Sequence, residues 1–591
     1  MRRQSLALAT LALLPAGLLA AGAARPGVEI DLKRPDPKRA TITTIAAGEP
    51  LEWAGAKLAG GDLNGDGLDD LVIAAPGGTD DRPSRRGRLY VVFGSLQPPR
   101  NSDIAIRYIP EVVPGKPGAR RMTTDADVLI DGADDFDHLG TSLAVADLDA
   151  DGFADIIAGA PRADGPLEKR ADCGEVFIVR GASSLPPRID LAAPPEGLRV
   201  HRIIGRAVGD AFGTSLATGD VEGDGNLDLM IGAPLAKGPA TPMVALDAGE
   251  VVVLSGEDAA SKWPSTIDLA QSGPVPRFIL SGTEPGVQTG YAVAAGDFDG
   301  DGIRDLAVSA RAADIGGRRF DAGEVYLVFG GTGLRQGMIL REHAGAVVLF
   351  PNIGDLGGGS LAFGDVDGDG RDDLIAAVEY ADGHREMALD AGDVTILAGR
   401  SRQDLEALRP PSIATGPAAT GPRAGKDAAA IAAASANAAV PSGPVILDLA
   451  DTTRPLAGLV TLHGVDPSDH TGVLGAFDLD EDGQAEILLG ASDAASRRNA
   501  RGGGGEIRIL PGGALTSRAI LLVGHDGAAI YGAQGNAHFG ASAVALDLDG
   551  DGRLELVVGA PTTGRTLSGR VWVMRASWAP LLRPPAGAGR P

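Results

Sequence analysis

Short apolar runs alternate with Gly-, Pro- and Asp-rich segments along most of this chain. In the first unit, "AKLAG" (56–60) precedes an acidic segment and "LDDLVIAA" (68–75) follows it. The runs are rich in Val, Ile and Leu, and they are too short for an amphipathic helix of three turns. This pattern predicts β-strands joined by tight loops.

Two further runs complete each unit. The third run has a shared signature, and it is "GRLYVVFG" (87–94), "GEVFIVRG" (174–181), "GEVVVLSG" (249–256), "GEVYLVFG" (323–330), "GDVTILAG" (392–399), "GEIRILPG" (505–512) and "GRVWVMR" (569–575). The fourth run begins with an "IDL"-like phrase, such as Ile189-Asp190-Leu191, and ends near a Gly, as in "HRIIG" (201–205). We therefore expect four antiparallel strands in each unit.

The unit is repeated seven times. Its acidic phrase stands at 61–76, 146–161, 219–234, 296–311, 364–379, 477–492 and 546–561. Seven units of four strands are typical of a β-propeller, with a linear solenoid as the alternative. The last unit stops after its third run, and the missing piece, "VEIDLKRPDPKRATITTIAAG" (28–48), stands ahead of the first unit. We predict an all-β, seven-bladed β-propeller over residues 28–578, in which the N-terminal strand closes the last blade.

Three segments do not fit the repeat. Residues 400–444 are rich in Ala, Pro, Gly and Ser, which indicates a low-complexity insertion in the fifth blade. Residues 579–591 are expected to form a flexible tail. Residues 1–24 carry Arg2 and Arg3 ahead of an apolar run and small residues at 21–24, as in a secretory signal peptide; a retained anchor is the alternative. We therefore expect a secreted or periplasmic protein.

Composition narrows the function classes. The 591 residues carry a formal charge of −25, which argues against nucleic acid as a partner and favours cations. The single cysteine excludes an intramolecular disulfide. An exported chain of this kind needs another means of stabilisation, which the acidic segments can supply.

The seven acidic segments, numbered here as loops 1 to 7, place oxygen-bearing side chains at alternate positions. Counted from the first Asp, positions 1, 3, 5, 7 and 9 are Asp62, Asn64, Asp66, Leu68 and Asp70 in loop 1; Asp147, Asp149, Asp151, Phe153 and Asp155 in loop 2; Asp220, Glu222, Asp224, Asn226 and Asp228 in loop 3; Asp297, Asp299, Asp301, Ile303 and Asp305 in loop 4; Asp365, Asp367, Asp369, Arg371 and Asp373 in loop 5; Asp478, Asp480, Asp482, Gln484 and Glu486 in loop 6; and Asp547, Asp549, Asp551, Arg553 and Glu555 in loop 7. Position 6 is always Gly, which permits a sharp turn with positive φ.

These loops predict metal sites. Positions 1, 3, 5 and 9 would bind through side chains and position 7 through its backbone carbonyl. A set of five or six hard oxygens without His or Cys favours Ca²⁺ over Zn²⁺ or Cu²⁺, and the tolerant geometry favours Ca²⁺ over Mg²⁺. We predict up to seven Ca²⁺ ions. An EF-hand, the alternative with similar spacing, requires Glu at position 12, which is apolar in all seven loops.

The repeat resembles the FG-GAP family, best known from the N-terminal propeller of integrin α subunits. "GAP" stands at 159–161, 232–234 and 559–561, and "FG" at 212–213 and 539–540. The resemblance covers roughly residues 28–576 and implies a calcium-binding propeller. It also departs from integrins, whose propellers typically carry calcium loops in only some blades, and no integrin-type receptor role is expected.

The sequence contains no recognisable catalytic motif. The eight histidines form no H-x-x-H or H-x-H pair, and no G-x-S-x-G or phosphate-binding loop occurs. We predict a non-catalytic extracellular binding or adhesion module, monomeric, whose partner is an unknown extracellular protein or polysaccharide bound by varied loops such as 77–87 and 379–392. A secreted hydrolase or lectin using the face opposite the acidic loops is the alternative, and a scaffold without a dedicated ligand is another.

Overall fold

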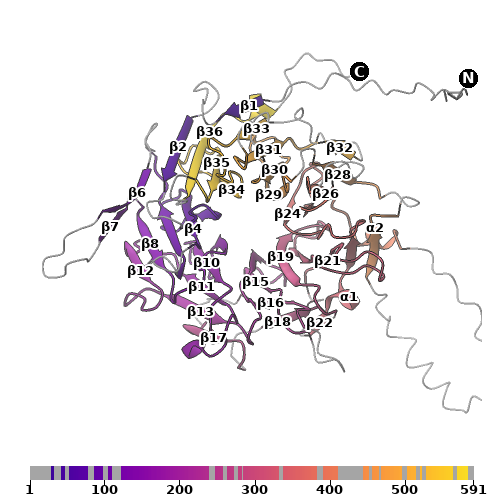
Figure 1. Cartoon of the computed structure of the whole chain (residues 1–591), viewed down its shortest axis with the longest axis horizontal. Helices are drawn as coiled ribbons and strands as arrows, with labels where there is room; N and C mark the ends of the chain where they lie inside the picture. The colour runs from indigo at the N-terminus through magenta and orange to yellow at the C-terminus, as the bar shows by residue number, and fades with distance from the viewer. Residues whose placement is uncertain are drawn as a thin grey trace, which may run out of the picture.

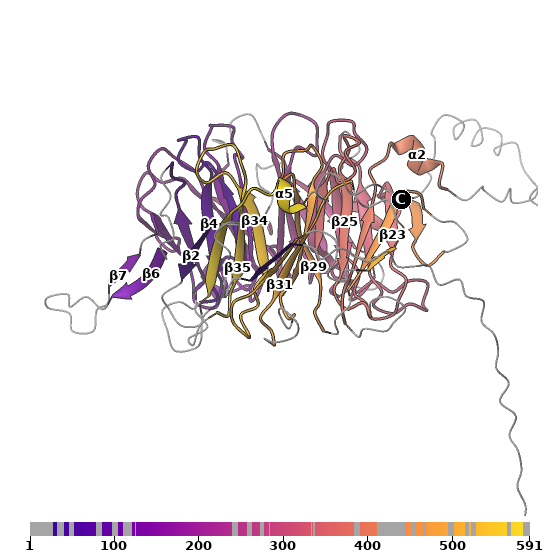
Figure 2. The same cartoon turned by 90° about the horizontal axis from the view of Figure 1, so that it is seen from above.

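Seven sheets, each of four antiparallel strands with a further strand at the outer edge, radiate from a central axis and form a closed ring (Figures 1 and 2). The structure is a computed structural model. It describes residues 28–31, 41–46, 52–77, 86–96, 104–109, 121–124, 126–238, 246–256, 263–271, 277–282, 284–331, 334, 337–382, 390–409, 444–451, 456–464, 468–494, 502–513, 519–521, 528–563 and 569–582. The predicted all-β, seven-bladed propeller is confirmed.

The inner three strands of every blade come from one continuous repeat. The innermost strands are β3 (Lys57–Gly61), β9 (Ser142–Ala146), β14 (Ser215–Gly219), β19 (Thr289–Gly296), β24 (Leu361–Gly364), β29 (Gly472–Phe477) and β34 (Ser542–Leu546). The second strands are β4 (Asp70–Ala75), β10 (Asp155–Ala160), β15 (Asp228–Ala233), β20 (Asp305–Ala310), β25 (Asp373–Val378), β30 (Glu486–Ala491) and β35 (Glu555–Ala560). The third strands are β5 (Arg88–Val92), β11 (Glu175–Val179), β16 (Glu250–Leu254), β21 (Glu324–Val328), β26 (Asp393–Leu397), β31 (Glu506–Leu510) and β36 (Arg570–Arg575).

The fourth strand pairs antiparallel with the third in each blade. These strands are β8 (Val128–Asp131), β13 (Val200–Ile204), β18 (Arg277–Ser281), β23 (Ala346–Leu349), β28 (Leu459–His463), β33 (Ala528–Tyr531) and β2 (Thr41–Ala46). All second strands are buried along their whole length, which explains why they read as continuous apolar runs.

A fifth strand covers the outer edge of every blade, and it corrects the predicted fourth run. The "IDL" phrase does not begin the fourth strand. It forms a separate strand that pairs parallel with the fourth strand of the preceding blade, as Arg188–Asp190 does with Leu129–Asp131. The fifth strands are β12 (Arg188–Asp190), β17 (Thr266–Asp268), β22 (Met338–Ile339), β27 (Val445–Asp448), β32 (Ala519–Leu521), β1 (Val28–Asp31) and β6 (Ile104–Ile109). An uncovered outer strand would expose unpaired backbone groups, so each blade shields its neighbour.

The N-terminal region closes the ring in two places. β2 pairs antiparallel with β36, from Thr41 opposite Arg575 to Ala46 opposite Arg570, and so supplies the fourth strand of the last blade. This confirms the predicted closure. The "VEID" phrase itself, β1, instead pairs parallel with β33 and covers blade six. β6, which belongs to the first blade's connection and forms a hairpin with β7 (Arg121–Thr124), pairs parallel with β2 and covers blade seven.

The hydrophobic core lies between the blades. Among the described residues, seven apolar clusters form, each containing residues of two neighbouring blades. At the closure, Ile45 of β2 packs in the same cluster as Leu71 and Tyr90 of blade one and Val573 of blade seven. Each blade therefore buries its faces only against its neighbours, as expected for a repeat architecture.

Parts of the predicted insertion and tail are ordered. Residues 401–409 contain the helical turn α2 (Arg402–Glu406), whose Leu405 is buried in the core between blades four and five. Likewise α5 (Ala579–Leu582) buries Leu582 beside blade seven. The first residues of both segments therefore pack on the ring, and the boundaries of the insertion and of the tail stay predictions. The rest of both segments, and the predicted signal peptide, lie outside the described residues.

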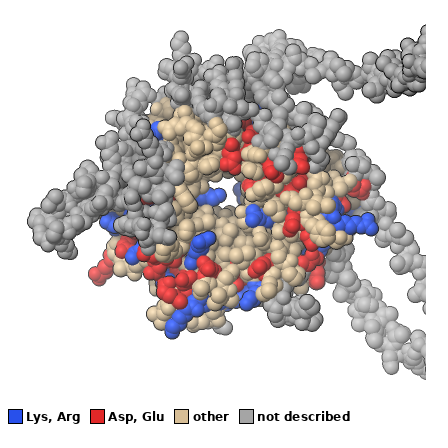
Figure 3. Space-filling view, viewed as in Figure 1, with Lys and Arg blue, Asp and Glu red and all other residues tan. Residues whose placement is uncertain are grey.

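The other helical elements are short: η2 (Pro166–Glu168) and α1 (Leu340–His343). Within the described ranges, no helix has the length and hydrophobicity needed to cross a membrane. Seen down the ring axis, the molecule has a central opening with Lys and Arg side chains at its border (Figure 3).

Candidate metal centres

All seven acidic loops join the first strand of a blade to the second, so they gather on one face of the ring. Position 1 follows the first strand directly or within two residues, and position 9 is the first residue of the second strand in every blade. Position 9 is buried in all seven loops, while most carboxylates at positions 3 and 5 are partly or fully exposed. The repeat therefore places the same set of oxygens at the same corner of each blade.

The first Asp organises each loop through backbone hydrogen bonds. In loop 1, Oδ1 of Asp62 accepts from the N–H groups of Gly65 and Asp66, and Oδ2 accepts from Gly67 N–H at 2.8 Å. The bond to the position-6 Gly recurs in all seven loops. That Gly has a φ between 82° and 91° throughout, which confirms the sharp turn expected of it.

The carboxylate at position 9 ties the loop to the third strand. Oδ2 of Asp155 accepts from Leu148 N–H and Oδ1 from Gly181 N–H, both at 3.0 Å. The same pair of bonds is found in loops 1 to 6. The Gly that ends the third run allows this approach, because a Cβ at Gly181 would lie 2.3 Å from the Ala154 carbonyl oxygen. Spacing alone identified position 9 as a ligand candidate and missed this structural role.

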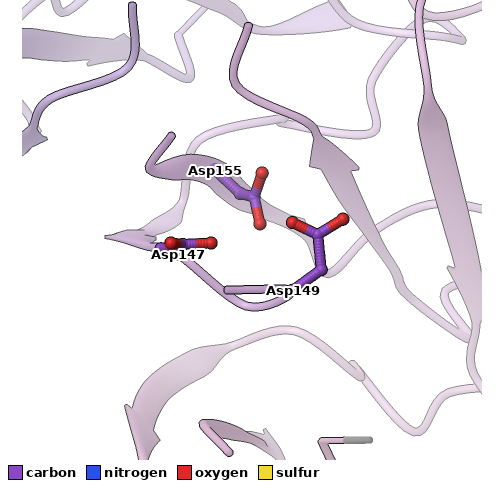
Figure 4. A group of neighbouring side chains, drawn as sticks. All are labelled: Asp147, Asp149 and Asp155. Carbon is purple, nitrogen blue, oxygen red and sulfur yellow. The ribbon is translucent and has the colours of Figure 1, made fainter. Parts of the chain in front are cut away.

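The carboxylates converge in five of the seven loops. One oxygen from each of three residues lies within 4.8 Å of the others in Asp147/Asp149/Asp155, Asp297/Asp299/Asp305, Asp365/Asp367/Asp369, Asp478/Asp480/Glu486 and Asp547/Asp549/Asp551. Figure 4 shows the three carboxyl groups of loop 2 facing a common space. In loop 1 position 3 is Asn64, and in loop 3 position 3 is Glu222, whose carboxylate accepts a hydrogen bond from Ser255.

The donor set fits a hard divalent cation. Oδ1 of Asp149 and Oδ1 of Asp549, both at position 3, are buried and have no hydrogen-bond partner in the described part of the chain. Buried acceptors of this kind are costly unless a donor or a cation satisfies them. All-oxygen ligands at this spacing suit Ca²⁺. Whether the carbonyl of position 7 completes the set stays a prediction.

Burial makes the negative charge at position 9 unfavourable without a cation. Desolvation is the largest cause and neighbouring loop carboxylates commonly add to it. Desolvation alone raises the pKa of Asp155 to about 6. Desolvation with the neighbouring carboxylates raises the pKa of Asp228 to about 6, and that of Asp70, Asp305, Asp373, Glu486 and Glu555 to about 7. A bound cation would hold these groups ionised.

The raised pKa values predict a pH dependence of the metal-free protein. Because the folded pKa at position 9 lies above the unfolded value of about 4, stability falls as the pH rises from about 4 to about 7. We expect a higher melting temperature at pH 5 than at pH 7.5 in calcium-free buffer, measured by circular dichroism, and a smaller difference in saturating Ca²⁺. In calcium-free buffer, an Asp305→Asn variant should reduce the dependence of the free energy of unfolding on pH by an amount that corresponds to about one proton. Equal melting temperatures at both pH values would contradict this.

Arginines reach the carboxylates of four loops; in loop 5, Arg371 lies 3.1 Å from Asp369 of the same loop. In loop 2, Nη1 of Arg180 lies 2.5 Å from Asp155, and Arg199 pairs with Asp149 and Asp151 at 2.8 and 2.7 Å. In loop 4, Arg402 of α2 pairs with Asp299 and Asp301. In loop 7, Arg575 lies 3.1 Å from Asp549 and 3.6 Å from Glu555. Arg199 and Arg402 are about half-exposed, whereas the side chain of Arg180 is 1% exposed.

Neighbouring loops are linked to one another. The N–H of position 8 donates to the carbonyl of position 1 in the preceding loop at five junctions, for example Ala154 to Asp62 at 2.8 Å and Asp69 to Asp547 at 3.1 Å. The side chain at position 7 packs on the neighbouring loop, since Phe153 lies against Gly65. Neighbouring loops are therefore connected around one face of the ring, and a conformational change in one loop would affect the contacts between blades.

Comparisons with known proteins agree with this geometry. The FG-GAP repeat model matches residues 54–92, 139–179, 212–254, 289–328, 357–397 and 539–574, which are blades one to five and seven. Blade six is identified by its strands and by loop 6. Relatives include phosphatidylinositol-glycan-specific phospholipase D of Mus musculus (32% identical, over 30% of this chain and 19% of that protein), integrin alpha-PS2 of Drosophila melanogaster (30%, over 33% and 12%) and integrin alpha-IIb of Homo sapiens (28%, over 52% and 25%).

The chain thus matches a quarter or less of the length of these relatives. Six matched repeats, a seventh blade of the same geometry and the ring topology agree with one another. This protein belongs to the FG-GAP repeat family, as an integrin α-like β-propeller.

Proposed function

We propose that this protein is an extracellular, calcium-stabilised binding module without catalytic activity of its own. The observation that carries the proposal is the repetition of one oxygen-rich loop at the same corner of all seven blades. In loops 2 and 7 it includes buried acceptors that have no hydrogen-bond partner among the described residues. Ions in these loops would stabilise the ring rather than take part in chemistry. The opposite face then carries the varied connections between second and third strands.

The histidines do not indicate a hydrolase. His463, at the end of β28, lies 2.9 Å from Asp393, and His470 lies 3.0 Å from Asp493. The buried Glu that begins several third strands is paired with arginine, as Glu175 is with Arg202. The similarity to a phospholipase D covers about a fifth of that protein and carries no activity to this chain. A lectin remains the second candidate, because tyrosines, serines and threonines line the central cavity.

Binding on arrays of glycans and extracellular-matrix proteins, in buffer with Ca²⁺, tests the proposal. We expect retention of the protein on at least one immobilised component and no turnover of ester, glycoside or phosphodiester substrates. Variants in the loop around residues 312–322 should reduce retention while leaving the melting temperature unchanged. Turnover by the purified protein would overturn the non-catalytic assignment.

The arginines predict unequal calcium sites. Arg180 is buried and has no room to withdraw, so its charge opposes a cation in loop 2, whereas Arg199 and Arg402 can turn into solvent. We expect calorimetric titration of calcium-free protein to show fewer than seven tight sites. Arg180→Met should add one, and Arg162→Met, an exposed control, should add none. Seven equal sites in the unaltered protein would contradict this prediction.

A further inference from the structure

A cavity of about 640 Å³ lies on the ring axis, at the end of the blades opposite the acidic loops. Its walls come from residues that begin the first strands, such as Lys57 and Ser142, and from residues that follow the second strands, such as Glu379 and Ser492. Lys and Arg side chains border the central opening of the ring (Figure 3). A cavity of this volume suits a ligand of roughly drug or disaccharide size.

Two charged side chains of opposite sign line the cavity. The side chains of Lys57, which is exposed, and Glu379, which is partly exposed, both line the cavity and make no hydrogen bond or ion pair among the described residues. Burial raises the pKa of Glu379, and Lys57, Arg311 and His470 oppose that shift. Lys57 of blade one and Arg311 of blade four therefore lie near one carboxylate of blade five.

Aromatic rings and hydroxyl groups complete the wall. The side chain of Tyr380, next to Glu379, is 41% exposed, and its ring lies 5.2 Å from that of His470. Asp493 accepts from His470 and is 3.2 Å from Nε2 of His538, so its charge is held in place. Trp263 and Trp578 are buried and offer no such surface. Threonine and serine hydroxyls line the opposite wall.

We propose that this cavity binds an acidic sugar, a uronic acid at the end of a short oligosaccharide. Its carboxylate would meet the Lys57 ammonium, its hydroxyls would donate to Glu379 and Asp493, and one face of its ring would lie on Tyr380. A free amino acid offers the same carboxylate beside a donor, but it leaves most of the cavity empty and does not use the ring of Tyr380. The assignment rests on the proposed function as a binding module and names its ligand class.

Isothermal titration of the full-length protein in saturating Ca²⁺ tests the assignment. The probes are galacturonic acid, digalacturonic acid, galactose and glycine. We expect saturable binding of both acids, tighter for the disaccharide, and none of galactose or glycine. Lys57→Met and Tyr380→Ala should each weaken binding by about tenfold or more. Lys169→Met, which removes an exposed lysine outside the cavity, should leave binding unchanged.

Three results would overturn the proposal: equal binding of galactose, binding of glycine in preference to the acids, or unchanged affinity in both cavity variants. Thermal melts in Ca²⁺ show whether each variant is folded. If one cavity variant does not fold, the affinity of the other tests the proposal. If the protein binds neither uronic acid but is retained on the arrays, only the proposed cavity ligand is wrong. Failure of both overturns the binding module as well.

Discussion

Removal of calcium should lower the melting temperature of this protein by more than about 10 °C. A ligand that binds only the folded state stabilises it by about 2.7 kcal/mol per site at one hundred times its Kd. Several loops contribute, and adjacent loops are joined by backbone hydrogen bonds, so the effect extends to the contacts between blades. Thermal melts in excess Ca²⁺ and in chelator measure it directly. Overlapping curves would contradict a structural role for the ion.

Two variants of loop 1 distinguish the stabilisation that comes from the ion from the stabilisation that comes from the loop's own hydrogen bonds. Asp66 is exposed, and Asn at this position keeps the oxygen that accepts from Leu68 N–H. Asp66→Asn should therefore reduce the response to Ca²⁺ and leave the melting temperature in chelator unchanged. Asp70 accepts from both Leu63 and Gly94 N–H. Asp70→Asn should destabilise the protein in both buffers, because an amide cannot accept both bonds as the carboxylate does. Mg²⁺ should restore little, since it demands a tighter octahedral shell.

Deletion of residues 28–46 should cause aggregation or a much lower melting temperature, although every predicted metal ligand remains. β36 would lose six backbone pairs with β2, and β33 of blade six would lose β1. Ile45 and Thr43 would leave the closure between blades one and seven, where both are buried. Light scattering and calorimetry measure the outcome. The exposed strand edges would then be free to pair between molecules.

A circular permutant provides the matched control. Moving residues 28–48 behind Ser577 gives the order β36, β1, β2, which is the order of third, fifth and fourth strands in the other blades. It should recover most of the lost stability. Deletion of residues 28–31 alone should cost less, because β1 supplies only the four-residue edge of blade six. A truncated chain as stable and monomeric as the full chain would show that the closure is not needed.

Features that depend on a few neighbouring residues could be predicted from the sequence. The turn at Gly67 and its six equivalents, the alternating oxygens of the loops, and the buried second strands each follow from local spacing or from continuous apolar runs. The missing last strand and its location at the N-terminus followed from counting repeats. These predictions needed no knowledge of distant contacts, because a repeat buries its core only against its neighbours.

The tertiary structure decided what depends on distant residues. The "IDL" strands could not be assigned to the preceding blade, because their partners are separated by tens to hundreds of residues and pair parallel. Arg402 belongs to the fifth unit and pairs with Asp299 in the loop of the fourth, because the ring places these two blades side by side. Arg180 pairs with Asp155 because the second and third strands of their blade are adjacent. Lys57 and Glu379 come from blades one and five and share a cavity because the ring closes. The sequence by itself determined the repeating unit and its acidic loops, since local geometry produces both. Closure of the ring determined which charges meet across blades, since only the full circle brings such residues together.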